Sequence, residues 1–500
     1  MSGMLGNLAL GFGAALSPLN LLYAFFGALV GTLIGVLPGL GPIATIAMLL
    51  PVSYGLEPLT ALIMLAGIFY GAQYGGSTTA ILVNIPGESS SVVTCLDGYA
   101  LARKGRAGPA LGIAALSSLF AGFVATFIIA LFGPVLAEWA LKFGPAEYFS
   151  LMVLGLVAAV VLAHGSLLKA VAMVVLGLLL GLIGTDVNSG TMRFTFDLYA
   201  LSDGIDFVVV AMGLFGFAEI ISNLEQTSER QILAPKIQGV LPTWDDFRQC
   251  WKAVLRGTAL GSFLGILPGG GATLSSFAAY TLEKKVARDP SRFGEGAIEG
   301  VAGPEAANNA GAQTSFIPLL TLGIPSNAVM ALMLGAMTIH GITPGPQVMS
   351  EQPVLFWGMI ASMLIGNLML VLLNLPLISI WVRLLSVPYR LLYPAILLLC
   401  GIGIYSIKGN SFDVFLAAGF GLLGYVFRKL DCEPAPLLLG LILGPMMEEY
   451  LRRAMLLSQG NAAVFFTRPI SLAMLLAAAV LLLLIVVPAV RTNREKAFQG

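Results

Sequence analysis

The sequence predicts an all-α polytopic membrane protein with two inverted repeats, each containing a re-entrant hairpin and a broken transmembrane helix. Three observations support this prediction: long uncharged apolar runs, an alternating charge in the loops, and a glycine-rich motif that occurs twice. Only 10% of the 500 residues are charged and 57% are hydrophobic, whereas a soluble globular protein has roughly 25% charged residues. This composition argues against a soluble enzyme.

The apolar runs predict the membrane spans. Residues 1–56, 306–350, 352–382 and 469–490 contain no Asp, Glu, Lys or Arg. A helix that crosses the hydrocarbon core needs about 20 predominantly apolar residues. Clear spans are expected over residues 111–133, 146–163, 166–184, 206–224, 353–376, 390–406, 411–427, 434–447 and 469–490.

The charges of the loops predict which ends of the spans face the cytoplasm. Arg103, Lys104 and Arg106 precede the first clear span, and the loops 225–256 and 283–305 are also rich in Lys and Arg. Cytoplasmic loops carry an excess of basic residues, so these segments are expected inside. The acidic loop 185–206 then lies outside, as the alternation of the spans requires.

A glycine-rich motif occurs twice and predicts the re-entrant hairpins. The run from Gly27 to Gly41 reads GALVGTLIGVLPGLG, and the run from Gly257 to Gly271 reads GTALGSFLGILPGGG. Residues 257–282 are uncharged, but the Pro-Gly cluster divides them into arms too short to cross a bilayer, and both flanks are basic. We therefore expect a hairpin that enters from the cytoplasm, and a first hairpin that enters from outside.

Two like hairpins that enter from opposite faces are typical of secondary transporters, which bind substrate near the membrane midplane on broken helices. The alternative is that the glycines only permit close helix packing. The expected organisation is a first repeat over 1–110 (hairpin 27–52, broken helix 59–95), a four-span connecting or scaffold region over 111–250, a second inverted repeat over 251–350 (hairpin 257–282, broken helix 306–340), and C-terminal scaffold helices over 351–500.

Polar residues and helix breakers follow each predicted hairpin and indicate a binding cavity, because irregular backbone at membrane depth requires protein or water around it. The residues expected to bind substrate are Pro38, Gly39, Gly41, Ser77, Thr78, Thr79, Asn84, Gly269, Gly270, Gly271, Thr314, Ser315, Pro325, Ser326 and Asn327. The residues expected to bind a cation are Gly75, Gly76, Ser77, Pro86, Gly87, Glu88, Thr273, Gln313 and Gly323. The alternative for each hydroxyl or amide is a helix cap that satisfies only local backbone.

The predicted lining favours a carboxylate together with a cation. Half-helix N-termini attract carboxylates, whereas hydroxyl and carbonyl oxygens suit an alkali cation. Residues 1–87 and 306–382 contain no Arg or Lys, so cations are expected to neutralise an anionic substrate. Few titratable groups lie there, which favours Na⁺ over H⁺ as the coupling ion. Glu88 either holds a cation or proton or stabilises the start of a helix.

Other classes of ligand are not expected. The formal net charge is zero, which argues against a nucleic-acid partner. Four cysteines without metal spacing and two isolated histidines support neither a disulfide framework nor a transition-metal site. Motifs for intramembrane catalysis, such as H-E-x-x-H, are missing from the apolar segments, so an enzyme is not expected and no cofactor is assigned.

At these motifs the chain resembles the large transmembrane subunit (TctA type) of the bacterial tripartite tricarboxylate transporter family. The resemblance covers essentially the whole chain. It rests on GVLPGLGP from Gly35, YGAQYGGSTTAILVNIPGES from Tyr70, DGY from Asp97 with ARKGRAG from Ala102, GPEAANNA from Gly303 and LGIPS from Leu322.

The resemblance implies a multi-pass carrier of the bacterial inner membrane that imports citrate-like or other organic carboxylates by cation symport, usually with Na⁺. It implies two protein partners, a small four-span membrane subunit and a periplasmic solute-binding protein that delivers the substrate. It also implies alternating access by a hairpin-bearing domain that moves against a scaffold. The alternatives are a proton-coupled carboxylate carrier, a channel-like permease that works without a binding protein, and a purely structural scaffold subunit.

Overall fold

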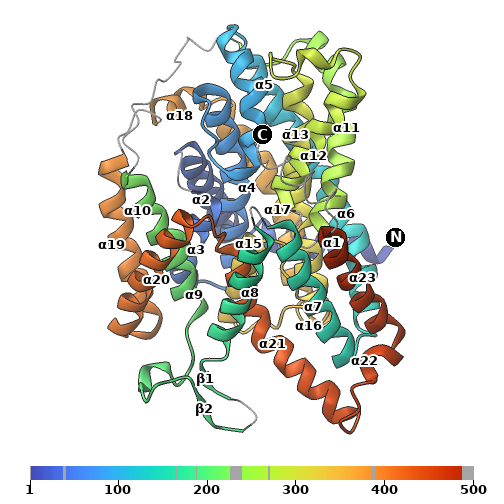
Figure 1. The fold of residues 1–500 in the computed structure, drawn as a ribbon. Helices are drawn as coiled ribbons and strands as arrows, with labels where there is room; N and C mark the ends of the chain where they lie inside the picture. Colours follow the sequence, from blue (N-terminus) through green and yellow to red (C-terminus); the bar gives the residue numbers. More distant parts are fainter. Residues whose placement is uncertain are drawn as a thin grey trace.

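The computed structural model describes residues 2–37, 41–163, 166–186, 189–225, 239–267, 271–384 and 389–486. These residues are almost entirely helical, and their strands β1 (Gly184–Thr185) and β2 (Met192–Arg193) form one short antiparallel pair. The helices Pro18–Val36, Pro58–Val83, Ala107–Ala140, Pro353–Asn374 and Ser411–Lys429 are each long and apolar enough to cross a membrane. The predicted class, an all-α polytopic membrane protein, is confirmed (Figure 1).

The N-terminal part places a pair of helices beside one long buried helix. α1 (Ser2–Ala15) precedes α2 (Pro18–Val36) and α3 (Pro42–Ser53), and α2 packs along α4 (Pro58–Val83). α4 ends at Val83, because the following Asn84 has a left-handed φ of 58° that stops the helix. The 3₁₀ turn η1 (Ser89–Ser91) and α5 (Val92–Arg103) follow.

The glycines of α4 do not break the helix. α4 is continuous through Gly71 and Gly75. A Cβ on Gly71 would meet the backbone nitrogen of Thr32, and one on Gly75 would meet the carbonyl oxygen of that residue. These glycines therefore serve the close approach of α2 to α4, and the break lies only after Val83.

The middle of the chain is also mainly helical. α6 (Ala107–Ala140), α7 (Pro145–Leu162) and α8 (Leu167–Gly181) lead to the β1–β2 pair and to the 3₁₀ turn η2 (Tyr199–Leu201). α9 (Phe207–Ala211), η3 (Met212–Phe217) and α10 (Ala218–Glu225) then run on without a break, and η3 is π-helical. Such π turns insert one residue per turn and often occur at functional sites.

The second glycine-rich motif lies in a second pair of helices. α11 (Trp244–Ile266) and α12 (Gly271–Val286) pack together, and Arg256 Nε donates to Glu283 Oε1 over 2.8 Å between them. After η4 (Pro290–Arg292), the chain continues through α13 (Glu299–Thr314) and α14 (Phe316–Leu322). Gly323, with a φ of 70°, ends α14, and α15 (Ala328–Ile339) begins after Asn327.

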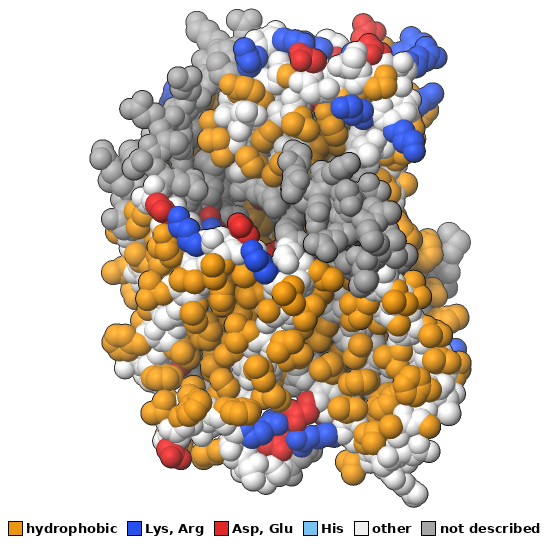
Figure 2. Space-filling view, in the orientation of Figure 1, with side chains coloured by type: hydrophobic (Ala, Val, Ile, Leu, Met, Phe, Trp, Pro, Cys, Tyr) orange, Lys and Arg blue, Asp and Glu red, His pale blue; other side chains and the backbone are white. Residues whose placement is uncertain are grey.

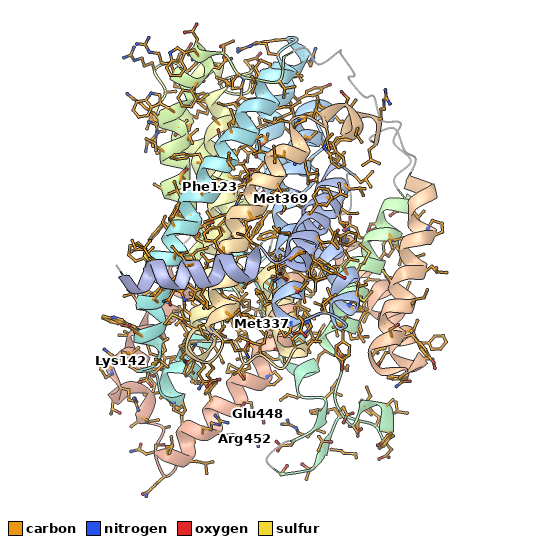
Figure 3. All side chains as sticks on the ribbon, turned by 180° about the vertical axis from the view of Figure 1, so that it is seen from behind. Phe123, Lys142, Met337, Met369, Glu448 and Arg452 are labelled. Carbon is orange, nitrogen blue, oxygen red and sulfur yellow. The ribbon has the colours of Figure 1, made fainter. Side chains whose placement is uncertain are left out.

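The C-terminal helices are α16 (Gln347–Glu351), α17 (Pro353–Asn374), α18 (Ile378–Leu384), α19 (Tyr389–Lys408), α20 (Ser411–Lys429), α21 (Ala435–Leu457), α22 (Val464–Thr467) and α23 (Pro469–Val486). α20 packs against η3, α21 packs against α7 and α8, and α23 packs against α7. α1 contacts α17, and Figure 3 shows it running across the back of the molecule at a steep angle to the longer helices. Figure 2 shows hydrophobic side chains over most of the visible face, with charged ones gathered toward its two ends and in a short row between them.

Two contacts between helices repeat each other residue by residue. A Cβ added at Gly27, Gly31 or Gly35 of α2 would collide with the carbonyl oxygen of Met64, Ile68 or Ala72 of α4, respectively; we call this contact the first seam. A Cβ added at Gly257, Gly261 or Gly265 of α11 would collide with the carbonyl oxygen of Gly303, Ala307 or Gly311 of α13, respectively. We call this contact the second seam. Both helix pairs thus touch backbone to backbone. The predicted domain boundaries themselves remain a prediction.

One aspartate connects the two parts of the chain that contain the glycine motifs, α2–α5 and α11–α15, which we call the glycine-motif parts. Asp97 of α5 is buried, and its Oδ1 accepts the backbone N–H groups of Gly294, Gly296 and Ala297 at 2.7–2.9 Å. Its Oδ2 accepts the Tyr280 hydroxyl at 2.9 Å. A buried carboxylate with four donors fixes the loop after α12 against α5.

Candidate functional site

A cavity of about 480 Å³ lies where the two glycine-motif parts meet. Its lining combines the beginnings of α3, α12 and α15 with the loop that follows α4. The lining residues from these segments are Gly41, Pro42, Ile43, Ala44, Pro86, Gly87, Glu88, Ser89, Gly271, Ala272, Thr273, Asn327, Ala328 and Val329. The volume falls within the range of about 300–1,000 Å³ typical of small-molecule sites.

The backbone makes this cavity suited to an anion. The first turn of a helix exposes N–H groups without intrahelical partners and carries a partial positive charge. α3, α12 and α15 all begin at the cavity. Three helix N-termini at one wall present backbone N–H groups of the kind that bind anions in proteins.

Polar side chains connect the segments around the cavity. Ser89, after α4, and Thr273, at the start of α12, face each other with their hydroxyl oxygens 3.0 Å apart. Asn327 caps α15, because its Oδ1 accepts the Met330 N–H at 3.0 Å, and its Nδ2 donates to Ser315 Oγ at 3.1 Å. These contacts join segments from both glycine-motif parts at the cavity.

Gly271 shows why the second motif needs glycine where α12 begins. Its φ of 51° is left-handed, which disfavours other residues, and a Cβ there would lie 3.2 Å from Asn327 Nδ2. The close approach keeps the start of α12 beside the start of α15.

The opposite wall comes from α7, η3, α10, α20 and α21 and carries charge. Arg428 of α20 and Glu219 of α10 line the cavity and form a salt bridge, and Glu433 lies on the same wall. Together with Glu88, three carboxylates and one guanidinium line this cavity among the described residues. Ser90 donates its hydroxyl to the carboxylate of Glu88, which directly precedes η1. Glu88 thus lies both at a helix start and at the cavity, the two positions considered from the sequence.

The structure brings some of the predicted site residues together and separates others. Gly41, Pro86, Gly87, Glu88, Gly271, Thr273 and Asn327 line the cavity. Pro38, Gly39, Gly269 and Gly270 lie outside the described residues. The others that the structure describes are not in the lining of this cavity: Gly75, Gly76, Ser77, Thr78, Thr79, Asn84, Gln313, Thr314, Ser315, Gly323, Pro325 and Ser326.

Most of the hydroxyls outside the lining bond to backbone. Thr79 Oγ1 donates to the carbonyl oxygen of Val36 at 2.9 Å, across the first seam. Thr314 Oγ1 donates to Ala310 O at 3.0 Å and Ser315 Oγ to Gly311 O at 2.7 Å, each one turn earlier in its helix. Ser315 also accepts from Asn327 and so supports the cavity wall indirectly. Asn84 and Gly323 end α4 and α14 by their left-handed backbone.

Two features of the structure were not predicted from the sequence. Arg428 and Glu219 reach the cavity from helices far from the glycine motifs, and no local pattern marks them. Glu305, 1% exposed on α13, accepts a hydrogen bond from Ser77 Oγ at 2.7 Å and another from the Thr94 hydroxyl. A signal for Glu305 existed, because this acidic residue directly precedes an uncharged run of membrane character.

The fold and the cavity define the class: a helical membrane protein with a cavity at which several helices begin is a membrane transport component. The comparison with known families gives the particular group. The chain belongs to the tripartite tricarboxylate transporter TctA family, whose model matches residues 21–439.

Two relatives come from Agrobacterium vitis. An uncharacterized 52.8 kDa protein in the TAR-I ttuC' 3' region is 57% identical over 498 residues, which cover 100% of this chain and 99% of the relative. An uncharacterized protein in the TAR-II ttuC' 3' region is 59% identical over 238 residues, which cover 48% of this chain and 98% of the relative. No solved structure matches the chain.

Proposed function

We propose that this chain, the large subunit of a tripartite tricarboxylate transporter, imports tricarboxylates or related citrate-like organic carboxylates by Na⁺ symport with alternating access. In this proposal it lies in the bacterial inner membrane, pairs with a small four-span membrane subunit, and receives its substrate from a periplasmic solute-binding protein. The observation that carries the proposal is the cavity at which α3, α12 and α15 begin.

The charges around the cavity support cation coupling. The helix N-termini offer partial positive charge, but the described lining has three carboxylates against one guanidinium. A substrate with two or three carboxylates adds further negative charge to a site of low dielectric, which is costly unless cations enter with it. Symport of cations with the carboxylate satisfies this requirement.

The test is uptake by the reconstituted complex. Proteoliposomes that contain this chain and the small subunit are supplied with the binding protein and radiolabelled citrate or other carboxylates, with and without an inward Na⁺ gradient. We expect saturable uptake that requires the binding protein and the Na⁺ gradient. Uptake that ignores Na⁺ and follows a pH gradient supports the proton-coupled alternative, and uptake without the binding protein or saturation supports a channel-like permease.

A matched pair of variants tests whether the described cavity is the substrate site. Thr273→Val removes a hydroxyl from the cavity lining, whereas Thr281→Val removes one from the exposed side of the same helix, where it donates to Phe277 O at 2.9 Å. We expect a higher KM for the carboxylate only in Thr273→Val. Equal kinetics of the two variants would move the site elsewhere.

A further inference from the structure

A second, much smaller cavity lies between the two glycine-motif parts and two scaffold helices. Its volume is about 20 Å³, which is enough for one water molecule or one monatomic ion. Its polar lining residues come from α4, α6, α13 and α17, and they are Tyr74, Ser77, Thr78, Ser118, Glu305 and Asn374. The remaining lining is aliphatic.

Glu305 is the charged group of this cavity. Its side chain is 1% exposed, and no Lys or Arg forms a salt bridge with it among the described residues. Ser77 donates to Oε2 at 2.7 Å and Thr94 donates to Oε1, so both carboxylate oxygens already act as acceptors. Hydroxyl donors to both oxygens suit the ionised form, and a buried ionised group requires a compensating charge.

Two further oxygens at the cavity have no partner. Asn374 is 4% exposed, and its Nδ2 donates to the carbonyl oxygen of Leu370 at 2.8 Å. This hydrogen bond fixes the orientation of the Asn374 amide, because the carbonyl oxygen of Leu370 accepts a hydrogen bond from the amide nitrogen and not from the amide oxygen. The amide oxygen, Oδ1, is then the buried atom without a hydrogen bond. The Tyr74 hydroxyl, on a side chain that is 4% exposed, is also buried and unpartnered.

We infer that this cavity binds a monovalent cation, Na⁺, with the Glu305 carboxylate as the charged ligand and oxygens of Tyr74, Ser77 and Asn374 as neutral ligands. Hard cations bind to carboxylate, hydroxyl and amide oxygens. One carboxylate balances one positive charge, whereas divalent sites usually gather several carboxylates. The assignment of this ion as the coupling ion rests on the proposed function, but its binding does not.

The position of the site explains how an ion there acts on the larger cavity. Ser77 lies on α4, which leads directly into the loop that contains Glu88 and Ser89, and Glu305 lies on α13. A cation between these helices neutralises the carboxylate and holds α4 against α13. Its binding therefore favours the arrangement in which the segments around the larger cavity lie together.

The test measures Na⁺ binding without any substrate. The purified chain, with the small subunit if that is needed for solubility, is melted in detergent at increasing NaCl, with choline chloride keeping the ionic strength constant. The variants are Tyr74→Phe, which removes one neutral oxygen and keeps the ring, and Glu305→Gln, which removes the charge. The matched control is Tyr70→Phe, because the Tyr70 hydroxyl is also buried and unpartnered on α4 but does not line this cavity.

We expect Na⁺ to raise the melting midpoint of the wild-type and Tyr70→Phe proteins with the same half-saturating concentration. Loss of one oxygen ligand in Tyr74→Phe should raise that concentration by about tenfold, which corresponds to the net free energy of one typical polar interaction. Glu305→Gln should abolish the response to Na⁺. If Glu305→Gln does not fold, the comparison of Tyr74→Phe with Tyr70→Phe decides.

Three results overturn the inference. The first is that Na⁺ stabilises the Tyr74→Phe and Tyr70→Phe proteins equally, and the second is that choline stabilises the protein as much as Na⁺ does. The third is that acid stabilises the protein without any dependence on Na⁺, which makes Glu305 a proton site. K⁺ binding tighter than Na⁺ overturns the choice of ion. Failure of the proposed function gives a different pattern, because the complex then shows no Na⁺-driven uptake while the purified chain still binds Na⁺ through Tyr74.

Discussion

Replacing Gly31 or Gly261 by alanine tests whether the two seams are equivalent. The new methyl group on Gly31 meets the carbonyl oxygen of Ile68, and the one on Gly261 meets that of Ala307, closer than van der Waals contact allows. Over-packing of this kind costs about 1–3 kcal/mol, whereas alanine is favoured over glycine in a helix by about 1 kcal/mol. We expect each variant to lose up to about 2 kcal/mol of unfolding free energy.

Gly419→Ala on α20 is the matched control, because a methyl group there meets nothing within 4 Å. It should gain only the helix-propensity contribution, so the difference between either seam variant and this control is the collision cost itself. The unfolding free energy is measured by denaturant titration in mixed micelles, followed by the fluorescence of the five tryptophans. If both seam variants behave like Gly419→Ala, the helices are not in backbone contact. If only one is destabilised, the equivalence of the two seams is refuted.

Three further predictions concern contacts between the parts. Ser89→Ala and Thr273→Val should each raise the KM for uptake about 2- to 10-fold. The double variant should raise the KM no more than the larger single effect, because both substitutions remove the same hydrogen bond. Effects on the KM that multiply would mean that the two hydroxyls act separately. Asp97→Asn should weaken the charge-assisted bonds to three backbone amides by about 1.5–3 kcal/mol and accelerate their hydrogen exchange, and unchanged exchange would contradict this role. Arg256→Met should lower the melting midpoint strongly because it leaves the buried Glu283 carboxylate unpaired, whereas the double variant with Glu283→Met should recover part of the loss; no recovery would show that the pair acts separately.

The class of the fold was predictable from the sequence, but the course of α4 was not. Uncharged apolar runs that are long enough to cross a bilayer predict a helical membrane protein, because a helix satisfies its own backbone hydrogen bonds in lipid. The sequence predicts a broken helix over 59–95 but not where it breaks, and the glycine-rich stretch with Gly71 and Gly75 lies inside a continuous helix against Thr32. A glycine that permits close packing and one that ends a helix look alike until the neighbouring helix is known, so the sequence does not separate the two cases.

The larger cavity was predictable where backbone geometry defines it. Gly41, Gly271 and Asn327 were expected at the site because proline, glycine and helix-capping residues surround them, and they line the cavity. Hydroxyl residues were less predictable, because Thr314 on α13 satisfies its own helix while Thr273 faces the cavity. Their spacing in the sequence is equally compatible with either orientation.

The charged wall was beyond local sequence patterns. Arg428 and Glu219 meet at the cavity only because α20 packs against the continuous segment of α9, η3 and α10. Contacts between residues about two hundred positions apart depend on tertiary packing, for which one sequence without relatives contains no direct signal. The absence of basic residues near the glycine motifs therefore did not exclude a guanidinium at the site.

The two seams restrict where this protein is able to bend. Helices whose backbones touch at three successive turns cannot slide past one another, since a shift along the axis would drive a branched side chain such as Ile34 or Leu264 into the space that now accommodates only a hydrogen atom. Each motif helix and its partner are therefore locked as a single rigid unit. Any large rearrangement must therefore take place at contacts other than the seams, and cross-links across a seam should be harmless to turnover.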